Sequence, residues 1–299
     1  MIKFNEQEKI DSVNGALALR PQINEIVDEI CKRGYSNICW LGVGGTWASA
    51  MQATVHMKEM SAIETWAENA AEYLTTGNKR ITKDTVVIIS SVTGNTKEVV
   101  DIKKIKAEVG ATVISFVDAK EAILLDLADY KISYPVNEQL KFFMVADRFM
   151  FNNGEFEDYE DMYAEFDKYL AQALVEVEKK AEPFAVEFAK KHWNDEMHYF
   201  VGAGNQWGAT YSYAMCYWEE QLWLKTKSIS SNEFFHGMFE IVTKETPVTI
   251  YIGEDAQRPL SERVANFIPR ICENYTIIDS KDYELKGISE KYRKHLSHH

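Results

Sequence analysis

Two patterns of apolar and polar residues alternate along the chain, one typical of helices and the other typical of buried strands. Residues 5–33 carry apolar positions at near-helical spacing, and Pro21 should divide them into two helices because proline cannot continue a helix. Residues 85–90 are instead almost continuously apolar, which is typical of a strand buried on both faces of a sheet. The pattern therefore predicts helices over residues 1–34 and a parallel sheet after them.

Strands and helices alternate over residues 35–136. We expect strands at 38–41, 62–66, 85–90 and 111–117, and helices at 47–60, 67–73 and 97–108. This order predicts a doubly wound α/β fold with a parallel sheet. Residues 137–190 are aromatic and helical in pattern, with an acidic run that is typical of a solvated face. We expect them to form connecting helices rather than a domain.

A second α/β pattern follows at residues 191–299. The five residues that end in Gly44 resemble the five that end in Gly204, so the two patterns are offset by 160 residues. The expected elements are strands at 198–201, 248–252 and 275–278, and helices from Gly204 to about 224 and from 261 to 272. The sequence thus predicts an α/β fold with two tandem, flavodoxin-like, doubly wound halves joined by helices.

Composition and charge narrow the function classes. The 299 residues are 46% hydrophobic and 26% charged, which is ordinary for a soluble globular protein. The net charge of −13 and the absence of a basic cluster argue against nucleic-acid binding. No apolar run is long enough to span a membrane and no signal region opens the chain, so we expect a cytoplasmic protein. The four cysteines are expected to be free thiols.

The loop at residues 91–96 is the most distinctive candidate site. It follows a buried strand and precedes a helix, where an open α/β sheet places its ligands. It supplies hydroxyls from Ser91, Thr93 and Thr96, together with Gly94 and Asn95. Such residues also cap helices, but so many hydroxyls around a glycine exceed what one cap needs. Because the whole chain is acidic, a phosphate would have to be held locally by these groups.

Two further segments carry candidate chemistry. Gly44, Gly45 and Thr46 follow the first strand, and they form either a tight turn or a further contact to phosphate or sugar; the pattern lacks the full dinucleotide fingerprint. His236 precedes a glycine near the start of a helix, and Glu220 lies sixteen residues before it. A carboxylate and an imidazole are what proton transfer between the carbon and oxygen atoms of a sugar requires.

Together these segments resemble the sugar isomerase (SIS) family, whose members carry two SIS subdomains in tandem. The loop at 91–96 looks like the family's S-x-S-G-x-T phosphate loop, and SNEFFHGMFEIV at 231–242 is similar to its S-G-E-F-x-H-G-P-x-E segment. Asn232 and Met238 depart from the glycine and proline that are usual there. The sequence of these segments is most similar to that of deglycases acting on phosphorylated fructose–amino acid conjugates. A C-terminal segment usual in the family is expected to be absent.

The resemblance implies a role for each candidate. Ser91, Thr93, Thr96 and Thr46 would hold the 6-phosphate, Glu220 would be the base, and His236 would be the acid, supplied by a partner subunit of a homodimer or larger homo-oligomer. Glu72 matches a frequent family glutamate. The implied reaction cleaves a fructosamine 6-phosphate to glucose 6-phosphate and free amine, with no metal and no redox cofactor. A sugar-phosphate isomerase, an amino-sugar deaminase-isomerase and a non-catalytic sugar-phosphate sensor are the alternatives.

The two halves are expected to differ at one point. The turn that corresponds to residues 91–96 in the second half is at 253–256, and it contains Glu254 and Asp255. Carboxylates there would repel a phosphate. The sequence therefore predicts one phosphate site, in the first half only.

Overall fold

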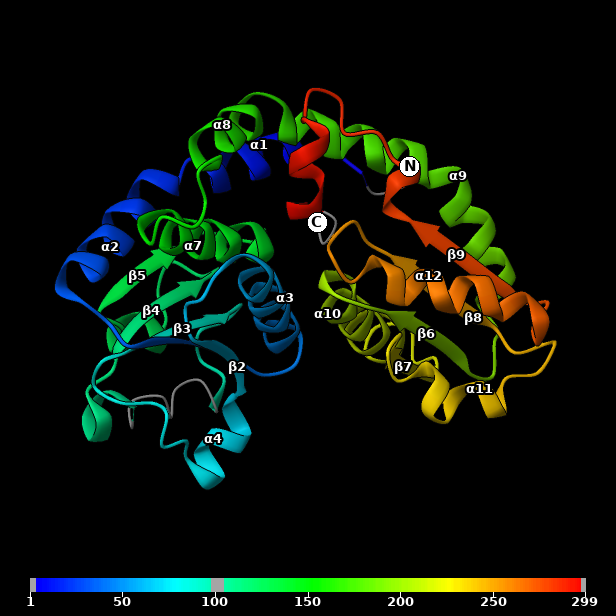
Figure 1. The fold of residues 1–299 in the computed structure, drawn as a ribbon, viewed down its shortest axis with the longest axis horizontal. Coiled ribbons are helices and arrows are strands. Elements are labelled where there is room, and N and C mark those ends of the chain that lie inside the picture. The colour runs from blue at the N-terminus through cyan, green and yellow to red at the C-terminus, as the bar shows by residue number, and fades with distance from the viewer. Residues whose placement is uncertain (1–3, 98–104, 297–299) are drawn as a thin grey trace. The chain divides into compact units, whose positions relative to one another are not determined.

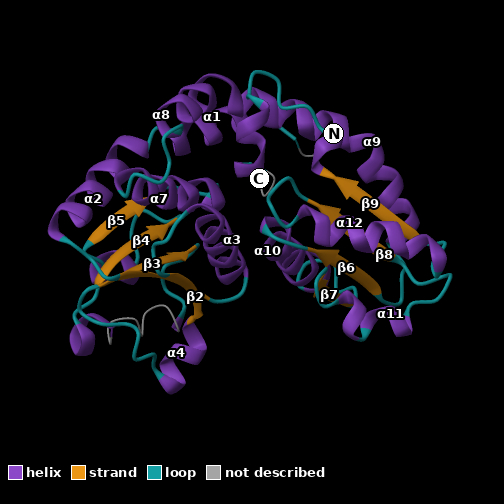
Figure 2. Ribbon diagram, in the orientation of Figure 1, coloured by secondary structure: helices purple, strands orange, loops and turns teal. Residues whose placement is uncertain are grey.

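The computed structural model describes residues 4–97 and 105–296. Contacts divide the chain into two compact units, one of residues 11–164 and the other of residues 1–10 and 165–299. Each unit is built around a parallel sheet, so the predicted α/β class with two flavodoxin-like halves is confirmed (Figures 1 and 2). The predicted segment boundaries stay a prediction. Among the described residues, no helix combines the length and the apolar character that crossing a membrane requires.

Two helices precede the first sheet, α1 (Glu6–Leu17) and α2 (Arg20–Arg33). Pro21 lies in the first turn of α2, where its missing N–H costs nothing, so the predicted break is confirmed. Gly34 ends α2 with a φ of 91°, and its backbone N–H donates to the carbonyls of Ile30 and Cys31. α2 therefore begins and ends where local chemistry favours it.

The first sheet has the strand order β2-β1-β3-β4-β5 among the described residues, and all four pairings are parallel. This is the flavodoxin-like order 2-1-3-4-5. The strands are β1 (Asn37–Gly42), β2 (Thr65–Asn69), β3 (Thr85–Ser91), β4 (Thr112–Val117) and β5 (Tyr130–Ser133).

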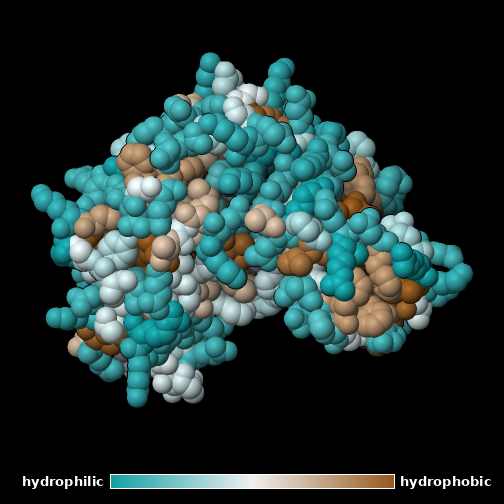
Figure 3. Space-filling view, in the orientation of Figure 1, coloured by the Kyte–Doolittle hydropathy of each residue, from teal (hydrophilic) through white to brown (hydrophobic). Residues whose placement is uncertain are grey.

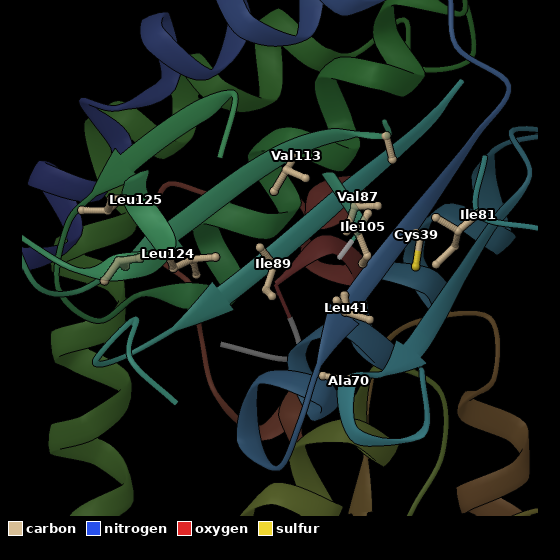
Figure 4. Close-up of a cluster of buried hydrophobic side chains, with 12 residues drawn as sticks. Cys39, Leu41, Ala70, Ile81, Val87, Ile89, Ile105, Val113, Leu124 and Leu125 are labelled. Carbon is tan, nitrogen blue, oxygen red and sulfur yellow. The ribbon is translucent and has the colours of Figure 1, made fainter. Parts of the chain in front are cut away.

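The helices of this unit cover the two faces of the sheet. Figure 1 shows α2, α3 and α7 on one side of β1–β5. On the other side lies an apolar cluster that includes Leu41, Ile89 and Val113, shown in Figure 4. The helices are α3 (Gly45–Met60), α4 (Ala70–Thr76), η1 (Ile105–Val109), α6 (Ile123–Leu127), α7 (Glu138–Asn152) and α8 (Tyr159–Glu165).

The second sheet has the order β7-β6-β8-β9, again all parallel, which repeats the first four strands of the first sheet. Successive residues of β6 face opposite sides, because Phe200 packs with Trp218 whereas Val201 packs with Ile250. The strands are β6 (His198–Gly202), β7 (Thr226–Ser230), β8 (Val248–Ile252) and β9 (Tyr275–Asp279).

The helical segments of the second unit precede and surround its sheet. Figure 3 shows hydrophobic residues at the surface in the region of α11, where Ile241 is 52% exposed. The segments are η2 (Phe166–Leu170), α9 (Ala171–His192), α10 (Asn205–Ser212), η3 (Tyr213–Glu219), η4 (Phe234–His236), α11 (Met238–Ile241), α12 (Arg258–Phe267), η5 (Ile268–Arg270), η6 (Ser280–Asp282) and η7 (Glu290–His295).

Several predicted elements need correction. The strand expected at 62–66 lies at Thr65–Asn69, because residues 62–64 form the turn that leads into it, and the following helix starts correspondingly later, at Ala70. The helix expected to reach about residue 224 ends at Glu219. Strands β5 and β7 were not predicted, because neither contains a continuous apolar run. Of the helix expected at 97–108, residues 98–104 lie outside the described residues.

Candidate functional site

The first sheet has a topological switch point between β1 and β3. From β1 the chain crosses to β2 on one side, whereas β3 and the later strands lie on the other side. Open α/β sheets bind ligands at such a point, outside the carboxyl ends of the strands. The loop after β1 holds Gly44, Gly45 and Thr46, and the loop after β3 is the one at residues 91–96. The fold therefore brings these two predicted segments to the same edge of adjacent strands.

The turn after β1 is tight. Gly44 has a φ of 62°, which favours glycine, and a Cβ on Gly42 would lie 2.7 Å from the backbone nitrogen of Trp47. The hydroxyl of Thr46 donates to the carbonyl of Val43 (3.0 Å) and lies 3.1 Å from the Val43 backbone N–H, which donates to it. Thr46 thus holds the turn together in this structure. A contact from Thr46 to phosphate stays a prediction.

The loop at residues 91–96 is ordered by its own hydroxyls. The backbone N–H of Gly94 donates to Ser91 Oγ (3.0 Å), and that of Asn95 donates to Thr93 Oγ1 (3.2 Å). A hydroxyl that accepts one hydrogen bond keeps its own proton for donation. Ser91 is buried, whereas Thr93 and Thr96 are exposed. The loop can therefore present hydroxyl donors to an anion while its backbone stays fixed.

Gly94 and Asn95 tie the loop to the neighbouring segment. Gly94 has a φ of 63°, and a Cβ there would lie 2.5 Å from the Cβ of Ala122. Its carbonyl accepts from the backbone N–H of Leu124 (3.0 Å), and Asn95 Oδ1 accepts from that of Ile123 (3.0 Å). Asn95 thus caps the first turn of α6. The structure gives it a positioning contact, and its predicted contact to substrate stays untested.

Glu72 lies at the same edge as the two loops. Its helix, α4, starts directly after the carboxyl end of β2, and Asn69 caps it by accepting from the backbone N–H groups of Ala71 and Glu72. The Glu72 side chain is exposed. The ligand role of Glu72 stays a prediction.

Sequence reasoning missed a buried charged group at this edge. Lys141 is fully buried, and its Nζ donates to the carbonyl of Tyr134 (2.6 Å) and lies 3.6 Å from a carboxylate oxygen of Asp118. Burial lowers the pKa of Lys141. Burial likewise raises the pKa of Glu138, although hydrogen bonds from Ser49 and Ser90 oppose the shift. Ser90 directly precedes the loop at residues 91–96, so Glu138 is close to that loop.

The turn before α7 is strained next to these groups. Val136 and Asn137 have φ values of 50° and 53°, and a β-branched residue such as valine rarely adopts that conformation. The backbone N–H of Val136 donates to Asp118 Oδ2 (3.1 Å). Strain of this kind tends to occur at functional sites. The sequence contained one signal for the buried charged group: Lys141 interrupts an apolar run in a predicted helix.

The second sheet has the same switch point, but a side chain of the protein occupies it. Gly204 has a φ of 59° and a ψ of −134°, close to the 62° and −129° of Gly44, so the 160-residue repeat holds in the backbone. Here Asp255 is buried, and its Oδ2 accepts from the backbone N–H of Asn205 (2.9 Å) while its Oδ1 accepts from that of Gln257 (2.8 Å). A carboxylate of the protein thus occupies the N-terminus of α10.

Glu220 and His236 lie at opposite ends of the second sheet. α10 begins at the carboxyl end of β6, and the helical segment continues through η3 to Glu219, next to the start of β7. The fifteen residues of α10 and η3 together span about 22 Å at the rise of an α-helix. His236 instead follows the carboxyl end of β7. One chain therefore does not bring the predicted acid and base together.

Both residues are exposed in their local settings. Glu220 is exposed beside Glu219, whose carboxylate accepts from the hydroxyl of Thr226 (2.5 Å). His236 ends the short segment η4, which Phe234 anchors in the core, and Gly237 follows with a φ of 150°. Met238, one of the departures from the family pattern, is buried and starts α11. Neither side chain is buried in its own unit, so each can meet a ligand or a second chain.

Comparison with protein families agrees with this site. Residues 33–148 match the model of the SIS domain family, so the chain contains a SIS domain, which confirms the predicted family. The matched residues include both loops at the first switch point.

Particular relatives extend the likeness to most of the chain. It is similar to fructosamine deglycase FrlB of Bacillus subtilis, with 24% identity over 288 residues, which are 92% of this chain and 87% of the relative. It is also similar to fructoselysine 6-phosphate deglycase of Escherichia coli O157:H7, with 22% identity over 277 residues, 87% of this chain and 77% of the relative. A solved structure of a candidate phosphosugar isomerase from Bacillus subtilis shares the fold, with a TM-score of 0.87, 23% identity, and coverage of 95% of this chain and 89% of the other.

Proposed function

We propose that the protein is an enzyme that processes a phosphorylated sugar, and that it cleaves a fructosamine 6-phosphate to glucose 6-phosphate and a free amine. The observation that carries the proposal is the hydroxyl-rich loop at residues 91–96, which lies at the switch point of a SIS domain. The names of the two deglycase relatives support the choice of reaction. The loop is the anchor for the phosphate, with Ser91, Thr93 and Thr96 as donors.

The reaction needs one base and one acid. The base, Glu220, removes a proton from C1 of the open-chain 1-amino-1-deoxyfructose 6-phosphate. The electrons form the C1–C2 double bond of an enaminol, while the C2=O double bond opens and its oxygen takes up a proton. Protonation at C2 then gives an imine between C1 and the nitrogen. Water adds to C1, the C1–N bond breaks, and the amine leaves with a proton. The acid, His236, protonates sugar oxygen during ring opening.

The positions of the two groups support an oligomeric enzyme. Glu220 and His236 are separated within one unit by the length of α10 and η3. A single substrate can contact both only if His236 comes from a second copy of the chain. The proposal therefore includes a homodimer or larger homo-oligomer whose active site is shared between subunits.

Activity assays on single variants test the proposed chemistry. The chain should release glucose 6-phosphate and free amine from at least one member of a panel of fructosamine 6-phosphates, detected by mass spectrometry. Glu220→Gln and His236→Ala should each lower kcat by about 10²–10⁴-fold with little change in KM, because both groups act on protons and not on the phosphate. Glu219→Gln, the exposed neighbour, is the matched control and should keep most activity.

A mixing experiment tests the shared site. Equal amounts of Glu220→Gln and His236→Ala chains, unfolded together and refolded, should recover about a quarter of wild-type activity per site if each site takes one residue from each chain of a dimer. No recovery would contradict the shared site but not the reaction. Turnover of glucosamine 6-phosphate or of a sugar phosphate without an amine, in place of the panel, would favour the alternative deaminase-isomerase or aldose–ketose isomerase.

A further inference from the structure

We propose that His192, Asp195 and His198 form a binding site for one divalent transition-metal ion of the zinc type. The three residues lie at the junction of two elements of the second unit. His192 is the last residue of α9, and His198 is the first residue of β6. The site has no part in the proposed reaction, so it stands or falls independently of it.

The donor atoms already converge. Asp195 Oδ2 lies 2.7 Å from Nδ1 of His192 and 2.8 Å from Nδ1 of His198. One ligand atom from each of the three residues can be chosen so that all lie within 4.8 Å of one another. Zinc binds imidazole nitrogen and carboxylate oxygen at about 2.0–2.2 Å, which separates tetrahedral ligands by roughly 3.4 Å. The two oxygen–nitrogen separations would therefore have to widen by roughly 0.6–0.7 Å to admit the ion.

The surroundings fix one of the two imidazoles in the right orientation. Nε2 of His198 lies 2.8 Å from the hydroxyl of Thr249 on β8. A metal-binding histidine usually donates its second ring N–H to such a partner, which leaves the other nitrogen for the ion. The ring of His198 also stacks on Phe200, with ring centres 4.5 Å apart. Packing and hydrogen bonding thus hold the Nδ1 atom of His198 toward Asp195.

The charge of the cluster also favours a cation. Nε2 of His192 is buried and has no hydrogen-bond partner among the described residues. The carboxylate oxygen Oδ2 of Asp195 lies between the Nδ1 atoms of His192 and His198. A divalent ion at this point would place a positive charge beside the carboxylate.

The donor set selects the kind of ion. Two nitrogens and one carboxylate suit Zn²⁺, Co²⁺ or Ni²⁺, whereas Mg²⁺ and Ca²⁺ prefer sites made of oxygen. Three protein ligands leave a fourth position, which water would fill. Since the ligands tie the end of α9 to the start of β6, the ion would stabilise this junction. A purely hydrogen-bonded carboxylate between two imidazoles is the competing arrangement.

Cobalt titration distinguishes the two arrangements. The full chain is treated with a chelator, and His298 and His299 are changed to alanine so that imidazoles near the chain end do not bind the probe. Co²⁺ should then bind at one equivalent per chain at micromolar concentration and give the strong visible absorption of a four-coordinate ion. The thermal midpoint should rise by about 5 °C at a hundredfold excess over Kd. Zn²⁺ should displace the Co²⁺ spectrum.

Variants locate the bound ion. Asp195→Asn keeps the size of the side chain but removes its charge, and it should weaken Co²⁺ binding about 100-fold or more. Asn194→Ala, in the same loop and exposed, is the matched control and should bind as the parent does. Circular dichroism checks that both variants are folded. The absence of saturable Co²⁺ binding by the parent chain, or equal binding by Asp195→Asn, would overturn the proposal.

Discussion

The two switch points of this chain have nearly the same backbone conformation but carry different side chains. Both follow a strand that ends in a glycine turn, and the turn glycines, Gly44 and Gly204, have nearly the same backbone angles. At the second one, the carboxylate of Asp255 accepts from the backbone N–H of Asn205, the first residue of α10. At the first one, the loop brings hydroxyls, which can donate to an external anion.

The difference shows how one architecture gives either a binding site or a structural contact. An N-terminal helix turn favours an anion in both cases. Where the chain supplies its own anion, as with Asp255, the turn is satisfied and an external phosphate would meet a negative charge. Where the chain supplies Ser91, Thr93 and Thr96, the anion that we propose is the phosphate of a ligand. On this proposal, a few residues in one loop distinguish the two halves.

The largest expected effect is at the glycine of the hydroxyl loop. Gly94→Ala places a methyl group 2.5 Å from Ala122 Cβ at a φ of 63°, so strain and overpacking add. The free energy of unfolding should fall by about 3 kcal/mol or more. Gly77→Ala is the matched control, since Gly77 has a φ of 66° and open space around it, and it should lose only about 1 kcal/mol. Urea titrations measure both; equal losses would show that the loop is not packed against Ala122.

Acid should weaken the second unit through a buried histidine. Burial lowers the pKa of His198 to about 4 from an ordinary value near 6.5. Without bound metal, the unfolded chain then takes up the proton first, so stability falls as the pH drops from about 6.5 to about 4 and levels off below that. The loss attributable to this group is at most about 3 kcal/mol. Hydrogen exchange should show it in β6 and β8; a His198→Gln chain with the same acid loss would contradict the assignment.

The internal anion of the second switch point should contribute a smaller amount. Asp255→Asn removes the charge that strengthens the hydrogen bonds from the Asn205 and Gln257 N–H groups. We expect a loss of about 2 kcal/mol in the free energy of unfolding, and no loss of sugar-phosphate binding. Thermal unfolding and a binding titration on the same sample measure the two quantities. Weaker sugar-phosphate binding would mean that the second switch point also contacts the ligand.

The smallest effect is expected at the first turn. Thr46→Val keeps the shape but removes the hydroxyl that bonds to both backbone groups of Val43. Stability should fall by about 1 kcal/mol. If Thr46 also contacts phosphate, KM for the sugar phosphate rises as well; an unchanged KM would restrict Thr46 to its role in the turn.

Much of the fold was predictable because the signals are local. The continuous apolar run of β3 and the repeated glycine turns identify two parallel sheets from sequence alone. β7 escaped prediction because Ile229 is its single apolar residue, so the segment carries no apolar run or alternation. The chemistry of residues 91–96 was also visible in the sequence. The hydrogen bonds of Asn95 to α6 and of Asp255 to α10 could not be predicted from the sequence, because they join residues that are 28 and 50 positions apart.

The most direct test is the stoichiometry and location of sugar-phosphate binding. Isothermal titration of glucose 6-phosphate into the Glu220→Gln chain, which leaves the phosphate loop intact, should give one site per chain. Replacing Thr93 and Thr96 together by alanine should weaken this binding at least about tenfold, because two hydroxyl donors to a charged group are lost. The same affinity in the double variant, or two sites per chain, would contradict the assignment of the phosphate to the first switch point.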